Sequence, residues 1–583
     1  MKIQAFRLRN ILTVIWIMAG IAASDIIGQQ KFTANTETSN SESAKKADEF
    51  LSQWDKKDMP GCGVGAVKDG QLVYKRGLGM ANLDYDVPNT PATLFNVASV
   101  SKVFTAASIV LLAQQGKLSL DDEVQKYVPE IPKYEHPVTL RHMLHHTSGI
   151  REYQALLFFG GHNPDNALSE KQVLGMLARQ RGLSFRPGTK YQYSNSNYQL
   201  LGMIVARVSG KSLRAFADEN IFKPLGMKNT RYFDNRKEVV KNRASGYMVG
   251  QDNSVRVRAS LFDLVGGGGI LTTVEDMYLW DQNFQEPKVG GREMAQLLTT
   301  PGVLNDGEKI KYGFGLFTNE YKGLPVFKHS GNMSGYRAQT ITFPEKKFTA
   351  IALCNNSAIL PHLIIEKLAD IYLDGQFPAA ASKSSKVDIA SLPAGTPIPE
   401  KEAARYAGIF VNTDIYSNFR LSMREGKLLM SGLAKGDLPV TRTAEGHLVM
   451  VEGDSRYEMV PVLDKTGTVS EMKLPRSGGS ADVFVRVKAP FDLPEKLGEY
   501  AGTYHSEEFN NEFVIQRDGG KFALRISESF EAPLAAAYED VFTTANGQIS
   551  LVFARGDNGK ITGFVFNAGL DGREVKGVVF KRQ

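Results

Sequence analysis

Cysteine is almost missing from this sequence. Only Cys62 and Cys354 occur among 583 residues, which excludes a disulfide-rich scaffold, and the pair lacks the spacing of a zinc site. Histidine is scarce too, and the nine histidines include one close group, His142, His145 and His146. No carboxylate or cysteine pattern accompanies this group, so we interpret it as structural or pocket-rim histidines and expect no metal site.

A marked excess of one charge is also missing. Lys and Arg total 69 against 63 for Asp and Glu, a formal net charge of +6. No basic face or known nucleic-acid-binding motif accompanies this small excess, so we expect no nucleic-acid partner.

Long hydrophobic runs are confined to the N-terminus. Residues 11–23 are mostly apolar, follow three basic residues and end in a stretch of small residues before Asp25. This is the pattern of a secretory signal peptide, and the run is short for a spanning helix, which needs about 20 apolar residues. We predict a signal peptide at 1–24, an exported protein (periplasmic or secreted), and no stable membrane span after cleavage. An uncleaved N-terminal anchor is the alternative.

The chain is too long for one hydrophobic core. Composition divides it into a polar leader at 25–44, a mixed helix-and-strand region at 45–375, a linker at 376–399 rich in Ala, Ser, Lys and Pro, and two strand-rich modules at 400–488 and 489–583. The modules resemble each other, because Tyr406-Ala407-Gly408 and Gly426-Lys427 recur at the same spacing as Tyr500-Ala501-Gly502 and Gly520-Lys521. We predict two similar β-barrels or β-sandwiches.

The region 45–375 begins and ends with predicted strands and is helical between them. Apolar residues at helical spacing predict helices that end near Gly116 and Gly210. The predicted strands are Gly61–Val67, Leu72–Gly79, Pro325–His329, Ala338–Phe343 and Thr349–Cys354. This order predicts one α/β domain whose first and last strands share a sheet.

Ser99 and Lys102 form the first candidate for chemistry. A spacing of three on a helix places both side chains on one face, and a serine hydroxyl needs a neighbouring base before it can attack. Ser99 would stand at the start of a predicted helix, where backbone N–H groups favour a developing oxyanion. Taken alone, the pattern is weak, and a capping serine with a surface lysine is the favoured interpretation.

Tyr193 and Asn195 form the second candidate. A tyrosine near a lysine ionises more easily and can act as base and then as acid, while the Asn amide can orient Lys102 or bind a substrate carbonyl. The alternative is a loop tyrosine followed by a helix cap.

The third candidate is His329-Ser330-Gly331, at the end of a predicted strand. Gly331 would let a substrate backbone approach closely, and the N–H of Asn332 would be a second oxyanion donor beside that of Ser99. The alternative is a strand-end histidine with a turn glycine.

Together, in this order, the three candidates match the scheme of serine acyl-enzymes. The surrounding segments Phe95–Lys102, Leu144–Ile150 and Gly331–Tyr336 fit as well. Over roughly residues 45–375 the chain resembles the penicillin-recognising serine hydrolases, the family of class C β-lactamases, D-alanyl-D-alanine carboxypeptidases and D-aminopeptidases.

The resemblance implies a fold and a mechanism. The fold is an α/β (α+β) β-lactamase-like domain with an antiparallel sheet flanked by helices, followed by two small all-β, barrel-like domains. Ser99 would be the nucleophile, Lys102 and Tyr193 would share the base role, and Asn195, His329, Gly331 and Asn332 would bind substrate. No cofactor is expected.

The expected reaction is hydrolysis of a D-amino-acid-containing peptide or amide, with peptidoglycan as one source of such a substrate, or of a small ester. The alternatives are a penicillin-binding or envelope-binding protein of slow turnover, and a β-lactamase. Class C β-lactamases usually carry Lys-Thr-Gly where this chain has His329-Ser330-Gly331. A mostly neutral imidazole suits the carboxylate of a β-lactam less well than a permanent cation does.

Two further expectations follow from the resemblance. D-aminopeptidases also carry two β-modules, one of which can send a loop toward the active site; Ser506–Glu512 and Ser527–Tyr538 are the candidate loops, with stability or envelope attachment as the alternative role. The first and last strands of the sheet should be antiparallel neighbours, which places Cys62 and Cys354 at one end. We expect two buried free thiols there, with a disulfide as the alternative.

Overall fold

The structure is a computed structural model that describes residues 41–583 with several gaps. The gaps are 163–165, 259–262, 379–394, 413–416, 433–435, 453–454, 476–480, 488–495, 519–520, 529, 545–547 and 571–572. The predicted signal peptide at 1–24 and most of the predicted leader and linker lie outside the described residues.

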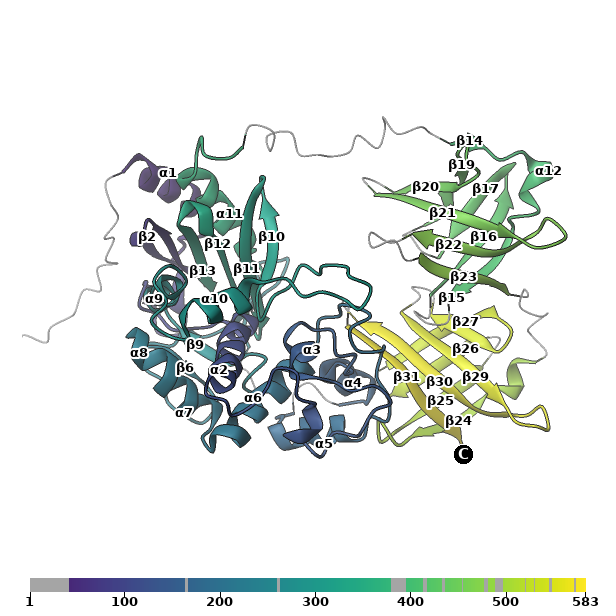
Figure 1. Ribbon diagram of the computed structural model, residues 1–583, viewed down its shortest axis with the longest axis horizontal. Helices are drawn as coiled ribbons and strands as arrows, with labels where there is room; N and C mark the ends of the chain where they lie inside the picture. Colours follow the sequence, from purple (N-terminus) through teal and green to yellow (C-terminus); the bar gives the residue numbers. More distant parts are fainter. Residues whose placement is uncertain are drawn as a thin grey trace, which may run out of the picture. The chain divides into compact units, whose positions relative to one another are not determined.

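The predicted antiparallel sheet is confirmed. Its six strands lie in the order β10 (Phe317–Tyr321), β11 (Leu324–Met333), β12 (Tyr336–Phe343), β13 (Phe348–Cys354), β1 (Cys62–Lys68) and β2 (Gln71–Leu78), and all neighbours are antiparallel (Figure 1). The two N-terminal strands, β1 and β2, therefore extend a sheet whose other four strands come from the C-terminal part of the domain.

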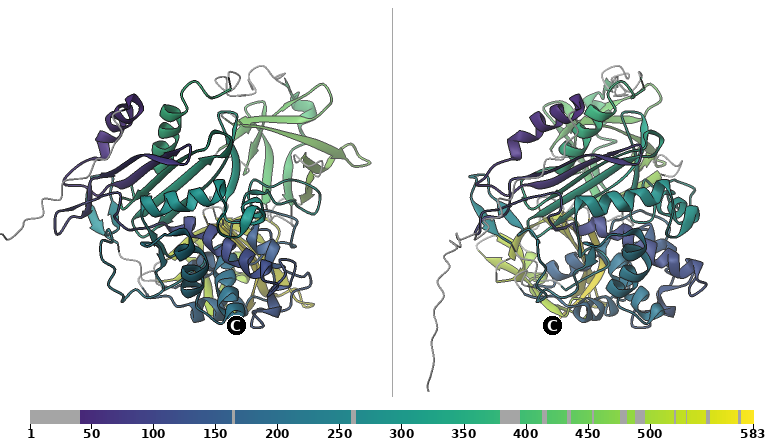
Figure 2. Two further views of the ribbon diagram at one scale, coloured as in Figure 1. Left: turned by 60° about the vertical axis from the view of Figure 1, so that its left-hand side comes forward. Right: turned by 90° about the vertical axis from the view of Figure 1, so that its left-hand side faces the viewer.

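Both faces of this sheet are covered by helices (Figure 2). Along β13, Ala350 and Ala352 belong to one hydrophobic core and Ile351 and Leu353 to the other, as the alternation of a strand requires. The first core lies under α1 (Glu42–Leu51) and α11 (Pro361–Tyr372), and the second lies under α9 (Val274–Gln285) and the helical region. A strand buried on both faces reads as a continuous apolar run, which is how this segment appears in the sequence.

The helical region lies between β2 and β10 in the sequence. Besides α9, its helices are α2 (Lys102–Gln114), α3 (Leu140–Leu144), α4 (Tyr153–Phe159), α5 (Glu170–Ala178), α6 (Asn195–Ser209), α7 (Leu213–Ala217), α8 (Lys223–Leu225) and α10 (Gly291–Thr299). Short strands pair between them: β3 (Met80–Asn82) with β4 (Val87–Pro88), β7 (Tyr247–Val249) with β8 (Val255–Val257), and β9 (Ile270–Thr272) with both β5 (Phe95–Asn96) and β6 (Arg231–Tyr232). Helix α2 is buried almost all round, so it is the central helix of this region.

Cys62 and Cys354 form a disulfide, so the expectation of two free thiols was wrong. The two residues are directly opposite each other in the β1–β13 ladder. The sequence predicted that the strands are neighbours but not their register, and a shift of one residue would have turned the two side chains to opposite faces of the sheet.

The C-terminal region is all-β apart from short helical turns, as predicted. The first module contains α12 (Glu400–Ala403) and a ten-stranded sheet in the order β14 (Thr396–Pro397), β19 (Thr441–Arg442), β20 (Leu448–Glu452), β21 (Ser455–Leu463), β22 (Val469–Pro475), β23 (Ala481–Val487), β15 (Gly408–Asn412), β16 (Ser417–Arg424), β17 (Lys427–Ser431) and β18 (Leu438–Pro439). The second is a closed barrel of β24 (Gly502–Ser506), β25 (Asn511–Asp518), β26 (Lys521–Ser527), β27 (Phe530–Tyr538), β28 (Val541–Thr544), β29 (Ile549–Arg555), β30 (Ile561–Leu570) and β31 (Arg573–Arg582).

The sequence repeat marks equivalent points in the two modules. Gly408 and Gly502 open the first long strand of each, and Gly426 precedes β17, whereas Gly520 lies outside the described residues. Of the two candidate loops, Ser506–Glu512 does contain the turn between β24 and β25. Ser527–Tyr538 is not a loop, because most of it forms β27, which pairs with β26 and β28.

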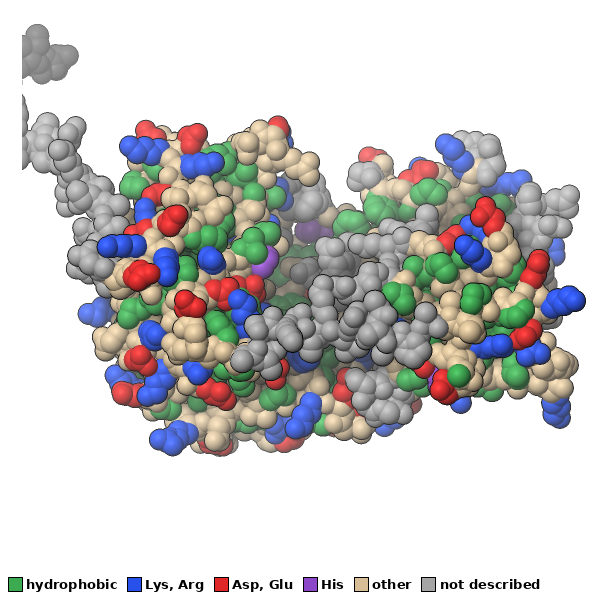
Figure 3. All heavy atoms as spheres, turned by 90° about the horizontal axis from the view of Figure 1, so that it is seen from above, with side chains coloured by type: hydrophobic (Ala, Val, Ile, Leu, Met, Phe, Trp, Pro, Cys, Tyr) green, Lys and Arg blue, Asp and Glu red, His purple; other side chains and the backbone are tan. Residues whose placement is uncertain are grey.

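Side chains of both charges are interspersed over the face drawn in Figure 3, as expected from the balanced composition. Within the described part of the chain, none of the helices has the length and apolar character needed to cross a bilayer.

Candidate active site

Ser99 and Lys102 stand at the start of the central helix. A 3-10 turn at Ala98–Ser101 leads directly into α2, whose first residue is Lys102. Ala98 adopts a positive φ of 46°, a strained conformation for an alanine, and the Asn96 side chain accepts its N–H at 2.9 Å. This turn leaves Ser99 half-buried while Lys102 is fully buried.

Three oxygens lie within hydrogen-bonding distance of the Lys102 side-chain nitrogen. Lys102 Nζ donates to Ser99 Oγ at 3.1 Å, to Asn195 Oδ1 at 2.8 Å and to the carbonyl of Gly267 at 2.6 Å. A buried lysine needs such acceptors, because burial without them carries a large desolvation cost. The contacts fix the amine beside the Ser99 hydroxyl, as the spacing of the two residues predicted.

The Gly267 carbonyl belongs to the stretch Gly266–Gly269, which passes close to α6. A Cβ at Gly266 would lie 2.5 Å from the carbonyl oxygen of Tyr198, and its φ is 113°. Glycine is required there so that the backbone can approach both α6 and Lys102.

Tyr193 lies over Lys102, with Nζ 4.9 Å from its ring centroid. It is two residues before Asn195, the first residue of α6, so the tyrosine and the asparagine reach the lysine from one segment. The structure therefore brings Ser99, Lys102, Tyr193 and Asn195 together.

Glu152 holds Asn195 in place, and the sequence analysis missed it. Its fully buried carboxyl group accepts the backbone N–H of Asn195, the Asn195 side-chain amide at 3.0 Å and the backbone N–H of Ser196 at 3.4 Å. An acidic side chain at a helix N-terminus is stabilised by the free N–H groups there. Because the side-chain NH2 group of Asn195 donates to Glu152, the Asn195 side-chain oxygen Oδ1 faces Lys102.

His329 lies on β11 and is buried beside Tyr193 and Tyr312. Its Nε2 is 3.2 Å from the Tyr312 hydroxyl and its Nδ1 is 2.6 Å from the carbonyl of Ser330. Burial, and then the charge of Lys102, lower the pKa of His329 from 6.5 to about 3. The imidazole is thus neutral at neutral pH, as expected for the histidine that replaces the lysine of the Lys-Thr-Gly motif.

His146 lies in the middle of a cluster of aromatic rings. Its ring lies 4.4 Å from that of Tyr193, 5.0 Å from Tyr198 and 4.8 Å from Tyr312, measured between centroids. Its Nδ1 accepts the N–H of Ser194 at 3.2 Å, and burial holds its pKa well below the usual 6.5. This neutral ring supports Tyr193 from the side of the core.

Gly331 and Asn332 lie on the strand facing Ser99. A Cβ at Gly331 would lie 2.1 Å from the carbonyl oxygen of Val97. Glycine is therefore needed at 331 so that β11 can pack closely against the backbone of Val97, two residues before Ser99. That differs from the expected reason, which was close approach of a substrate. Asn332 is exposed and its side chain accepts from Arg337.

The β-barrel also contacts the segment that carries Tyr193. Gln192 donates to the backbone carbonyl of Glu574, and the Glu574 carboxylate pairs with Lys190 at 2.9 Å. The start of β31, which neither candidate loop includes, is thus one barrel element beside this segment; Glu508 of the candidate loop Ser506–Glu512 pairs with Arg151 on the same side of the domain.

A family model for beta-lactamases matches residues 46–363 of the chain, which is more than half of its length. The chain belongs to the beta-lactamase family. Among relatives in this family, a D-aminopeptidase from Brucella anthropi is 25% identical over 536 residues, which are 90% of this chain and 95% of the relative. A penicillin-binding protein from Bacillus subtilis is 29% identical over 413 residues, which are 68% of this chain and 85% of the relative.

A solved structure shares the fold of this beta-lactamase-family protein. An octameric penicillin-binding protein homologue from Pyrococcus abyssi matches with a TM-score of 0.51 and 23% identity, over 76% of this chain and 99% of the other. Family membership and the arrangement around Ser99 identify the chain as a serine hydrolase.

Proposed function

We propose that this protein is an exported hydrolase that releases D-amino acids from peptides or amides through an acyl-enzyme on Ser99. The observation that carries the proposal is the hydrogen bond from Lys102 to Ser99 Oγ, with Asn195 and Tyr193 on the other sides of the same amine. A serine next to such a proton-handling pair is an activated nucleophile.

The reaction has two steps. Ser99 Oγ attacks the scissile carbonyl carbon and its proton passes to the Lys102–Tyr193 pair. The carbon–nitrogen bond then breaks, and the amine leaves with that proton. Water attacks the acyl carbon and gives a proton to the pair. The carbon–Oγ bond then breaks, the pair returns that proton to Ser99 Oγ, and the carboxylic acid is released. The backbone N–H groups of Ser99 and Asn332 bind the carbonyl oxygen as it becomes negative.

The substrate class rests on a relative that aligns over nearly its own whole length. The D-aminopeptidase of Brucella anthropi aligns over nearly the whole chain, β-modules included. The neutral His329 agrees with this choice, because a β-lactam carboxylate would gain little from an uncharged imidazole. Peptide fragments of peptidoglycan are natural candidates for such a substrate.

Two features support export. The N-terminal 24 residues have the composition of a signal peptide. The Cys62–Cys354 disulfide persists in an oxidising compartment and is rare in the cytosol. The N-terminal sequence of the mature protein from fractionated cells tests this; a chain that begins near residue 25 in the periplasm or medium is expected, and an intact N-terminus in the cytosol would refute export.

A substrate panel tests the activity. Purified protein is compared on the p-nitroanilides of D-alanine and L-alanine, a D-Ala-D-Ala peptide, a small ester and a β-lactam. We expect kcat/KM for the D-alanyl amide to exceed that for the L-alanyl amide on the order of 10²-fold or more. A single burst without turnover on every substrate would instead indicate a penicillin-binding protein, and a preference for the β-lactam would indicate a β-lactamase.

A further inference from the structure

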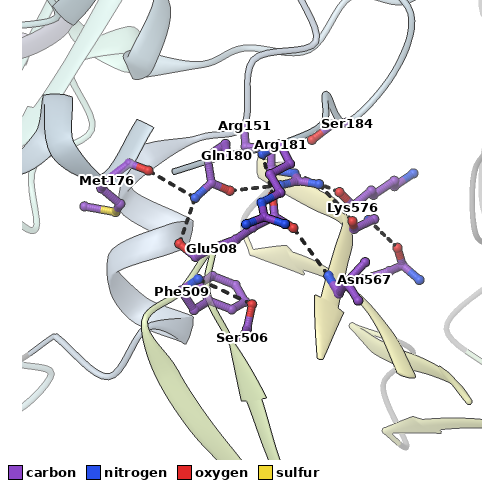
Figure 4. Close-up of polar contacts among 12 residues, drawn as sticks. Arg151, Met176, Gln180, Arg181, Ser184, Ser506, Glu508, Phe509, Asn567 and Lys576 are labelled. Atoms are coloured by element: carbon purple, nitrogen blue, oxygen red, sulfur yellow. Dashed lines mark hydrogen bonds and ion pairs between the residues drawn. The ribbon is translucent and has the colours of Figure 1, made fainter. Parts of the chain in front are cut away.

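Arg151 and Glu152 are neighbours of opposite charge that serve two different parts of the molecule. Glu152 holds the N-terminus of α6 and the Asn195 side chain, as described above. Arg151 binds the C-terminal barrel, and its side chain is only 1% exposed (Figure 4). One short segment thus connects the barrel to the residues around Lys102.

The barrel surrounds the Arg151 guanidinium with acceptors. Arg151 Nη1 pairs with the Glu508 carboxylate, Nε donates to the carbonyl of Lys576 at 2.8 Å, and Nη2 donates to the carbonyl of Gly577 at 2.9 Å. Gln180 of the hydrolase domain accepts from Nη1 at 2.9 Å. Glu508 is 6% exposed, so this is a buried ion pair across the interface.

A β-bulge in the barrel presents these carbonyls. Between β30 and β31, Phe566 pairs with Val578 and Ala568 with Val575, so Lys576 and Gly577 together face the single residue Asn567. Gly577 has a φ of 71° and donates its N–H to Asn567 Oδ1 at 2.9 Å. The bulge takes the two carbonyls out of the regular ladder, which frees them to bind Arg151.

The backbone of the segment is fixed on the active-site side as well. The Ser196 hydroxyl donates to the carbonyl of Arg151 at 2.7 Å and accepts the N–H of Tyr153 at 2.8 Å. Both bonds join the segment to the first turn of α6, which also carries Asn195. A displacement of Arg151 would therefore move Glu152 and Asn195 with it.

We propose that Arg151 and Glu152 are positioning residues through which the docked barrel holds Asn195 and Lys102 in their working geometry. A buried guanidinium is strongly disfavoured without its partners, so the segment 151–153 keeps this position only while Glu508 and the β31 carbonyls are present. The barrel is then a structural part of the active site. This inference rests on the proposed role of Ser99 and Lys102 in the reaction.

Glu508→Gln in the full-length protein tests the inference, with Glu507→Gln as the matched control. Glu507 pairs with Arg181 at the same interface, but the two side chains are 60% and 71% exposed, so the control removes the same charge without disturbing Arg151. The readout is covalent labelling of Ser99 by a small fluorophosphonate, followed as kinact and KI, which needs no knowledge of the natural substrate.

We expect kinact to fall roughly tenfold or more in Glu508→Gln with KI little changed, because misplacement of a reacting group slows the bond-forming step. Glu507→Gln should label at the wild-type rate. Glu152→Gln should also lower kinact, and the double variant Glu152→Gln/Glu508→Gln should lose little more than the more impaired of the two singles, because both act on one chain of contacts.

Wild-type kinact in Glu508→Gln, or fully additive losses in the double variant, would overturn the inference. If Glu508→Gln does not fold, Arg151→Lys carries the same test; it keeps the charge but lacks the planar fork that reaches four acceptors, so its kinact should also fall. Wild-type kinact in Arg151→Lys would equally overturn the inference. Failure of the proposed role of Ser99 is distinguishable, because the wild-type protein would then show no labelling of Ser99.

Discussion

At the scale of single residues, the proposed chemistry depends on a lysine that has no access to solvent. Lys102 is held by Ser99, Asn195 and the Gly267 carbonyl, and Tyr193 lies over it. Because Lys102 and Tyr193 handle the same proton in the proposed reaction, the pair should behave as one unit in mutagenesis.

Lys102→Ala and Tyr193→Phe should each lower the rate of acylation by about 10²-fold or more, and the double variant should lose little beyond the stronger single. Groups that transfer one proton between them are not additive. Single-turnover acylation of the three variants gives the measurement, and melting temperatures show whether each is folded. Losses that multiply in the double variant would mean that the two residues act independently.

The buried His329 predicts a pH dependence of stability. Its pKa of about 3 in the folded protein lies below the ordinary value of 6.5, so the unfolded chain binds more protons between these two pH values. The neutral His329 therefore makes its full contribution to the free energy of unfolding above about pH 6.5. That free energy falls by about 1.4 kcal/mol per pH unit as the pH falls from there toward 3.

The measurement is the free energy of unfolding between about pH 4 and pH 6, in the wild type and in His329→Gln. The wild-type slope should exceed that of the variant by one proton. This difference removes the contributions of other buried groups, such as Asp281, whose raised pKa acts in the opposite sense. Equal slopes would show that His329 is protonated in the folded state.

The sequence predicted the residues at the centre of the site but not those that support them. Ser99, Lys102, Tyr193 and Asn195 stand in short patterns with a known chemical meaning. Glu152 follows the segment Leu144–Ile150 after one residue, but its partner Asn195 is 43 residues away. Such a contact is a product of the tertiary fold, and a lone acidic residue carries no local signal for it.

At the scale of elements, strand β1 is attached to the sheet by a covalent bond as well as by its ladder. The disulfide joins Cys62 in the first strand to Cys354 in the last strand, across 292 residues of sequence. Removing it frees a very long loop in the unfolded chain, which stabilises the unfolded state.

The double variant Cys62→Ser/Cys354→Ser should lose about 2–5 kcal/mol of stability and keep its activity at room temperature, because the cysteines lie away from Ser99 in the opposite core. Chemical denaturation measures the loss. Thiol titration of the denatured wild type without reductant should find no free thiols, and two free thiols would show that the bond does not form.

Element positions were predictable where the pattern was strong. The strands at both ends of the hydrolase domain and the helices ending near Gly116 and Gly210 appear where periodicity placed them. Strand β27 was missed because Ala residues and Pro533 are poor strand formers. Closure of the barrel, which pairs this segment on both sides, outweighs that local preference.

At the scale of the whole molecule, the barrel is packed directly on the hydrolase domain. Phe159 of α4 meets Phe566 of β30 with ring centroids 5.2 Å apart, and Phe158 meets Phe530 at 5.5 Å. The repeat in the sequence predicted two β-modules, but not that one of them would bury Arg151. Docking depends on matched surfaces, which leave no periodic trace in the sequence.

The most direct test of the account is the site of the acyl group. The protein is mixed with a D-alanyl ester, quenched in acid within the turnover time, and digested for mass spectrometry. We predict a D-alanyl adduct on the peptide that contains Ser99 in the wild type and no adduct in Ser99→Ala, which should also lose about 10⁴-fold or more in turnover. An adduct on another residue, or one that persists in Ser99→Ala, would contradict the account.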